Sequence, residues 1–102
     1  MYAEGKGVSQ NYAEAIKWLQ LSAARGDTLA QSSISIMYSL GRGVPQDYVL
    51  AHMWMNLAAS GLPPGKERDD AISNRDLIEK KMTPSQVAEA QRRAREWKPQ
   101  DK

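Results

Sequence analysis

The sequence predicts an all-α fold, an α/α solenoid of about five helices with no strands. The main observation is an internal repeat, because a shift of 36 residues places residues 38–60 over residues 2–24 with ten identities in 23 aligned positions. A fixed period of this length is typical of stacked helical units. The second observation is that the repeated positions combine turn glycines with apolar residues at helical spacing.

The identical positions are those that stacked helices need at their turns and contacts. They are Tyr2/Tyr38, Gly5/Gly41, Gly7/Gly43, Val8/Val44, Gln10/Gln46, Tyr12/Tyr48, Ala15/Ala51, Trp18/Trp54, Leu21/Leu57 and Ala23/Ala59. From these pairs, together with Trp97, we predict the structural core of the repeats: Tyr2, Gly5, Gly7, Val8, Ala15, Trp18, Tyr38, Gly41, Gly43, Val44, Ala51, Trp54 and Trp97.

The pattern Gly-x-Gly-Val-x-x-Asp/Asn-Tyr-x-x-Ala-x-x-Trp-x-x-x-Ala-Ala resembles the Sel-1-like repeat, a relative of the tetratricopeptide repeat. The resemblance is carried by residues 2–24 and 38–61, and residues 82–97 look like the closing helix that often follows bacterial arrays of this kind. It implies antiparallel helix pairs in a tetratricopeptide-like superhelix that serves as an interaction scaffold. Such repeats commonly have glycine, which permits close helix approach, where Ser35 stands.

We expect one domain in three parts. Residues 1–26 form a partial repeat that lacks its first helix, residues 27–61 a complete repeat, and residues 62–102 a C-terminal capping helix pair. Two readings of the first part stay open: the chain is the C-terminal piece of a longer array, or it is a short protein whose first full element is a second helix.

The first two helices have recognisable start signals. Asn11 with Glu14 three residues later predicts a helix that runs to about Arg25. Its inner side is expected to hold Ala15, Trp18, Leu19 and Ser22. Asp27 predicts the N-cap of a second helix that ends at Gly41. Two adjoining apolar rows on this helix are expected to pack between its own partner and the next unit: Ala30, Ile34 and Met37, and Leu29, Ile36 and Leu40.

Three further helices follow. The third is expected from Asp47 to Gly61, after a loop whose two glycines allow positive φ and whose proline fixes φ. Two prolines then break the period, and a highly charged helix is expected over residues 65–81. The last begins at Thr83, where a capping box is predicted, and ends near Trp97. Its inner row is expected to be Val87, Ala90, Ala94 and Trp97.

Composition excludes several functions. The chain has no cysteine, which rules out disulfides, thiolate metal sites and cysteine nucleophiles. No apolar run reaches the length of a membrane span, and the first fifteen residues contain no signal-peptide core, so we expect a soluble protein, cytoplasmic if the chain is complete. The formal net charge of +2 is too small to predict a nucleic-acid partner. No cofactor or metal is expected.

Other candidate residues have plain structural interpretations. The tryptophans favour core packing over base stacking. His52, the only histidine, is favoured as a surface or partly buried residue because no second metal ligand accompanies it. The carboxylates Asp69, Asp70, Asp76 and Glu79 are interpreted as a solvated helix face rather than an acid pair. The best basic cluster is Arg92, Arg93, Arg95 and Lys98, which lies where a helix C-terminus favours positive charge.

The leading hypothesis for function is a non-catalytic scaffold that presents a concave helical groove to a protein or peptide partner. The residues expected to face that groove are Thr28, Gln31, Ser32, Ser35 and Ser39, and the alternative is that this row simply faces solvent. A second hypothesis is a structural assembly module that self-associates or docks through its open first repeat, where Tyr12, Ala15 and Trp18 should leave apolar surface uncovered. The sequence shows no paired general acid and base, so we predict no enzyme activity.

Overall fold

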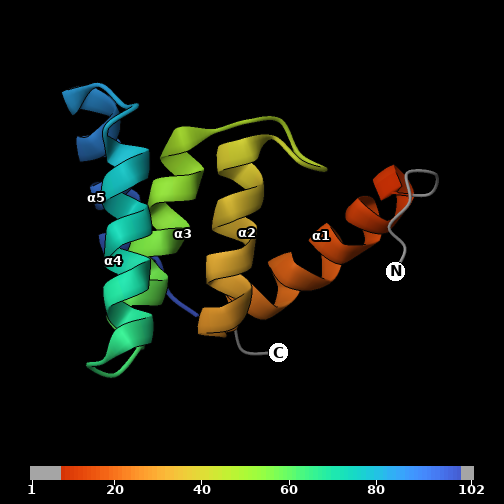
Figure 1. The fold of residues 1–102 in the computed structure, drawn as a ribbon, viewed down its shortest axis with the longest axis horizontal. Helices are drawn as coiled ribbons and strands as arrows, with labels where there is room; N and C mark the ends of the chain where they lie inside the picture. The colour runs from red at the N-terminus through yellow and green to blue at the C-terminus, as the bar shows by residue number, and fades with distance from the viewer. Residues whose placement is uncertain (1–7, 100–102) are drawn as a thin grey trace.

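A computed structural model describes residues 8–99, with side chains from residue 13 onward, and within that range it has five helices and no strand (Figure 1). The helices are α1 (Val8–Ala24), α2 (Thr28–Leu40), α3 (Tyr48–Gly61), α4 (Lys66–Glu79) and α5 (Pro84–Glu96). In Figure 1, α2, α3 and α4 lie side by side with alternating chain direction, α5 lies behind α3 and α4, and α1 inclines away from α2. The predicted all-α fold is confirmed.

Side-chain caps confirm three of the predicted helix starts. The Asp27 carboxylate accepts two backbone hydrogen bonds at the start of α2, and the Asp47 carboxylate accepts one from Leu50 at the start of α3. Thr83 and Gln86 form the predicted capping box, in which each side chain accepts a hydrogen bond from the other residue's backbone N–H. These bonds satisfy N–H groups that have no partner within the helix itself.

The predicted start of α1 is wrong, because the helix begins at Val8 and Asn11 lies within it rather than at its cap. Between residues 8 and 12 the first repeat differs from the second at two positions, with Ser9 in place of Pro45 and Asn11 in place of Asp47. A proline disfavours helical geometry in the residue before it, so Val44 stays outside a helix, and α3 begins only after Asp47. Serine imposes no such restriction. Tyr2, Gly5 and Gly7, and the side chains of Val8 and Tyr12, lie outside the described part of the chain.

The loop between α2 and α3 reverses the chain through two glycines with positive φ, as predicted. Gly41 has φ of 73° and Gly43 has φ of 76°, a region that favours glycine. The loop is closed by a hydrogen bond from the backbone N–H of Asp47 to the carbonyl oxygen of Tyr38, at 2.9 Å. Val44 is half-buried and packs inward, so this loop contributes to the core.

The core consists of two apolar clusters. The first joins α1 to α2 and contains the buried residues Ile16, Ala23, Ala30 and Ile34. The second joins α3 to α4 and contains Ala51, Met55, Ala59, Ala71 and Ile78. Tyr38 packs on both clusters. Trp54 packs on the first and meets Trp97 edge to face, with ring centroids 6.2 Å apart. In α5, Ala90 is fully buried, while Val87, Ala94 and Trp97 are half-buried.

The predicted inner side of α1 requires a correction at Trp18, which is 67% exposed. The side chains that α1 buries are Ile16 and Ala23, so the helix is turned by about one residue from the predicted orientation. Trp54, at the matched position of α3, is covered by the first core cluster and by Trp97. Within the described residues no helix covers Trp18 in the way that α5 covers Trp54.

Candidate binding groove

Helix α2 buries two sides and leaves a third open. Ala30 and Ile34 pack toward α1, whereas Leu29, Ile36 and Leu40 are 74%, 43% and 54% exposed. The prediction that this second apolar row packs between helices is therefore wrong. The reason is that α1 and α3 already occupy the two other sides of α2. Three large apolar side chains on one open helix face are the first sign of a binding surface.

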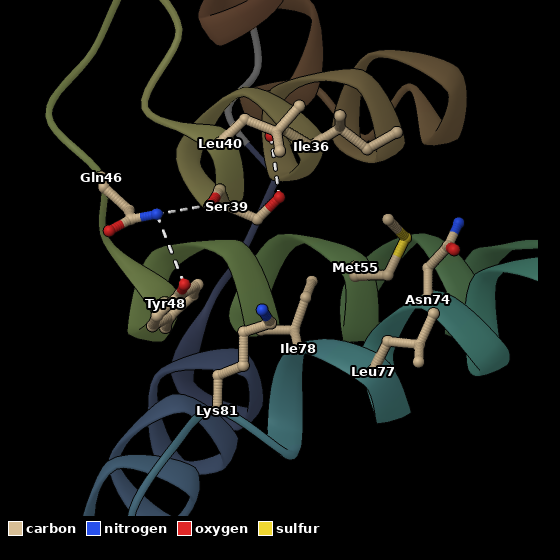
Figure 2. A pocket seen from close by; sticks show the side chains of 10 residues that line it. All are labelled: Ile36, Ser39, Leu40, Gln46, Tyr48, Met55, Asn74, Leu77, Ile78 and Lys81. Atoms are coloured by element: carbon tan, nitrogen blue, oxygen red, sulfur yellow. Dashed lines mark hydrogen bonds between the residues drawn. The ribbon is translucent and has the colours of Figure 1, made fainter.

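Helix α4 faces this open row across α3. Its Leu77 is 56% exposed and lines the same hollow as Ile36 and Leu40, which has a volume of about 460 Å³ (Figure 2). The floor is made by Met55 and Ile78, which are 0% and 7% exposed. An apolar hollow with a buried floor suits an apolar side chain from a partner.

One wall of the hollow is polar, but its polar groups are already paired. The Nε2 group of Gln46 donates to the carbonyl oxygen of Ser39 at 2.9 Å and to the hydroxyl of Tyr48 at 3.3 Å (Figure 2). The Ser39 hydroxyl donates to the carbonyl oxygen of Ile36 at 2.8 Å. These hydrogen bonds stabilise the wall. The contacts that the hollow can offer a ligand are therefore mainly apolar.

A second, smaller hollow of about 200 Å³ lies between the N-terminal parts of α2 and α4. It is lined by Leu29 and Ser32 on one side and by Glu67 and Asp70 on the other. Asn74 borders both hollows, so the two are adjacent parts of one surface. We name the two hollows together the α2–α4 groove.

The groove has opposite charges at its two ends. Lys81 borders the larger hollow, whereas Glu67 and Asp70 border the smaller one. Asp70 is paired with Lys66 at 3.1 Å. Among the residues that the structure describes, Glu67 and Lys81 have no ion-pair partner, and the Asn74 side chain has no hydrogen-bond partner. One anion, one cation and one amide are thus available to a ligand.

The five residues predicted to face a groove divide into two groups. Thr28, Ser32 and Ser39 border the α2–α4 groove. Gln31 and Ser35 are buried, and this is a correction, since in this structure neither can touch a partner. The Gln31 side chain donates to the carbonyl oxygen of Ala23 in α1, and the Ser35 hydroxyl donates to that of Ala51 in α3 at 2.6 Å. The small Ser35 side chain permits this close helix approach.

Sequence reasoning missed the main groove-lining residues, which are Ile36, Leu40, Asn74, Leu77 and Lys81. A signal for the α2 residues was present, because two apolar rows on one helix exceed what contacts with two neighbours require. The α4 residues had no comparable signal. Which side of that charged helix faces α2 is decided by packing between helices and not by local pattern.

His52 is fully buried, which corrects its expected position at or near the surface. Its Nε2 lies 3.0 Å from the Oε1 atom of Glu79, which joins α3 to α4. A carboxylate only accepts hydrogen bonds, so Nε2 donates, and Nδ1 is left buried without a partner. The described residues contain no group of three potential ligands that could hold a metal ion.

Three of the four candidate carboxylates and two of the four candidate basic residues pair with neighbouring side chains. Asp76 contacts Arg75 at 3.3 Å, and Asp70 and Glu79 contact Lys66 and His52. On α5, Glu89 accepts hydrogen bonds from both Arg92 and Arg93. The hydrogen bond from Arg92, followed in size by the one from Arg93, lowers the pKa of Glu89. The hydrogen bond with Glu89 raises the pKa of Arg92. Much of the basic cluster is therefore neutralised on its own helix.

Comparison with known families settles the origin of the repeat. The family model of the Sel1 repeat matches residues 1–27 and residues 28–61, which together make up more than half of the chain. The chain belongs to the Sel1 repeat family. Sel1 repeats are helical solenoid modules that generally act as scaffolds for protein–protein interaction. No curated protein and no solved structure matches the chain. None of the described helices is long and apolar enough to cross a membrane.

Proposed function

We propose that this Sel1 repeat chain is a non-catalytic binding module that holds an extended segment of a partner protein in the α2–α4 groove. The observation that carries the proposal is the set of exposed side chains Ile36, Leu40 and Leu77 around a hollow of about 460 Å³ with a buried apolar floor. Contiguous exposed apolar surface in a small helical domain is costly unless a partner covers it.

Asn74 favours an extended segment over a helical one. A helix satisfies its own backbone hydrogen bonds, whereas an extended segment brings free N–H and C=O groups. The Asn74 side chain offers a donor and an acceptor at the junction of the two hollows, where such a backbone would pass. The groove follows α4 for about 20 Å, at 1.5 Å per residue, which matches about six extended residues.

Charge gives the segment a direction. An acidic group fits beside Lys81, at the larger hollow, and a basic group fits beside Glu67, at the smaller one. The apolar contacts would supply most of the affinity, and the charges would select the orientation. The expected ligand therefore carries a large apolar side chain next to its acidic end and a small one next to its basic end.

The test is a selection of random seven-residue peptides on the full chain, followed by fluorescence anisotropy with the enriched peptides. Leu77→Asp should weaken binding at least about tenfold, which corresponds to about 1.4 kcal/mol. Leu21→Asp makes the same change at an exposed leucine of α1 and should leave binding unchanged. If Leu77→Asp keeps its helicity by circular dichroism and binds as well as the original chain, the groove is not the site.

Charge reversal tests the chemistry of the ligand separately. Lys81→Glu should shift the selected peptides from acidic to basic residues beside the large apolar side chain. Lys80→Glu is the matched control, because Lys80 is exposed and adjacent in sequence but does not line the groove. If the original chain, Lys81→Glu and Lys80→Glu all select the same peptides, the groove remains the proposed site but Lys81 has no part in choosing the ligand.

A second candidate function is structural assembly by self-association through α1. The observation that favours it is that Trp18 and Leu21 are 67% and 50% exposed on the side of α1 away from α2. Static light scattering over a concentration series tests it. Self-association that Trp18→Ser removes would support it, whereas a monomer at every concentration would exclude it.

A further inference from the structure

One row on α1 combines apolar and charged residues in a specific order. Glu14, Trp18 and Leu21 follow one another at spacings of four and three residues, so they lie along one side of the helix. Arg25, in the turn directly after the last residue of α1, continues this spacing by four residues. All four are exposed. The opposite side of α1 packs on α2. We name these four residues the α1 row.

The α1 row is complementary to itself when its direction is reversed. The midpoint between Trp18 and Leu21 lies between residues 19 and 20, and the midpoint between Glu14 and Arg25 lies at the same place. A two-fold axis through this point would place each tryptophan on a leucine and each glutamate opposite an arginine. Such a surface matches a second copy of itself, which is the property that a two-fold dimer interface requires.

We propose that two copies of this chain associate through antiparallel α1 helices, with Trp18 packed on Leu21 of the second copy and Glu14 facing its Arg25. The proposal specifies the geometry of the assembly function given above and rests on it. A parallel pair is disfavoured because it would bring Glu14 against Glu14 and Arg25 against Arg25. Like charges directly opposite each other oppose association.

Glu14 and Arg25 are both available for ion pairs with a second copy. The structure gives Glu14 and the Arg25 side chain no ion-pair partner among the residues it describes. At the position of α3 that matches Trp18, Trp54 is covered by a second aromatic ring, against which it packs edge to face. In the dimer, the apolar contact supplies affinity and the exposed ion pairs set direction and register, because exposed ion pairs contribute little energy by themselves.

Sedimentation equilibrium of the full chain tests the charge arrangement. Each dimer contains two Glu14–Arg25 contacts, so Glu14→Arg or Arg25→Glu alone should raise the dissociation constant about tenfold. The double variant restores opposite charges and should return to within about threefold of the original value. Lys80→Glu is the matched control, because it makes the same kind of charge reversal at an exposed residue that ends α4, away from the α1 row, and it should have little effect.

Cross-linking gives an independent measurement, because the chain has no cysteine of its own. A mixture of Glu14→Cys and Arg25→Cys proteins, treated with a short bis-maleimide, should give mainly the mixed dimer by mass spectrometry. Each variant alone should give little cross-linked product. Dimerisation without rescue by the double variant, or equal cross-linking of each variant alone, would overturn the antiparallel register while leaving self-association intact. A chain that stays monomeric up to its solubility limit would overturn both.

Discussion

Helix α1 in the first Sel1 repeat and α3 in the second carry the same tryptophan in two different environments. Trp54 of α3 is packed on the first core cluster and against Trp97, whereas Trp18 of α1 is 67% exposed. The helices share the repeat pattern, but α3 packs on α2, α4 and α5, while α1 packs mainly on α2. The repeat pattern therefore determines which side chains can be buried, and the number of helices packed around each repeat decides whether they are.

The same comparison extends to two other matched positions. Ile16 of α1 corresponds to His52 of α3, and both are buried, one among apolar residues and one bonded to Glu79. Arg25, after α1, corresponds to Gly61 at the end of α3, where a side chain would collide with the neighbouring helix. These pairs allow the role of each environment to be measured by matched substitutions.

The largest difference is expected at the tryptophans. Trp54→Ala removes a side chain packed on two sides and should lower the free energy of unfolding by about 3 kcal/mol. Trp18→Ala changes an exposed residue and should alter it by less than about 0.5 kcal/mol. Urea denaturation followed by circular dichroism measures both values. Equal losses in the two variants would show that the tryptophan environments are not different in solution.

The next effect concerns the close approach of α3 and α2. A Cβ atom at Gly61 would lie 2.7 Å from the Cγ2 atom of Thr28, so Gly61→Ala should destabilise the protein by about 1 kcal/mol. Thr28→Ser removes that methyl group. In the double variant the alanine should become neutral or stabilising, because alanine favours helix over glycine. A double-mutant cycle by urea denaturation gives the coupling, and simple additivity would contradict the proposed collision.

A smaller effect, this time an increase in the free energy of unfolding, is expected when His52 is replaced by isoleucine, the residue at the matched position of α1. His52→Ile removes a buried nitrogen that lacks a partner, and Glu79, with its side chain 42% exposed, can be solvated instead. The substitution should stabilise the protein by up to about 1 kcal/mol. Thermal melting at neutral pH measures the change. Marked destabilisation would show that the contact between α3 and α4 through Glu79 outweighs the unpaired nitrogen.

The smallest effect concerns α5, the helix that brings Trp97 onto Trp54. Because the pKa of Glu89 is lowered in the folded protein by its hydrogen bonds from Arg92 and Arg93, its contribution is present at neutral pH and is lost as pH falls through the lowered value. Thermal melting from about pH 6 to about pH 3 should show a smaller loss for Glu89→Gln than for the original chain. Parallel losses would assign the acid sensitivity to other carboxylates.

Much of the fold could be predicted from local signals. Asp27, Asp47 and Thr83 mark helix starts through hydrogen bonds that depend on a few neighbouring residues, and each is observed. The start of α1 differs from the prediction because the capping-box pattern of Asn11 and Glu14 is not decisive by itself. Ser9, unlike Pro45 in the second repeat, does not keep the preceding residue out of a helix, so α1 begins at Val8.

The candidate site was harder to predict because it depends on which side of α2 faces which neighbour. The row from Thr28 to Ser39 was correctly read as small and polar, but those properties suit a close helix contact as well as a solvent-facing surface. Gln31 and Ser35 serve the contact, and the apolar residues Ile36 and Leu40 face outward instead. Hydrophobicity alone cannot assign these sides when a helix has two neighbours and one free face.

The hydrogen bonds of Gln31 and Ser35 have a mechanical consequence. One connects α2 to a carbonyl of α1, and the other connects it to a carbonyl of α3. Both bonds would break if α2 slid along its axis by even one residue, so shear between these helices is opposed. Small rotations of whole helices keep both bonds intact. Any widening of the α2–α4 groove should therefore occur by tilting of α4, which can adjust to ligands of different bulk without changing the register of the repeat.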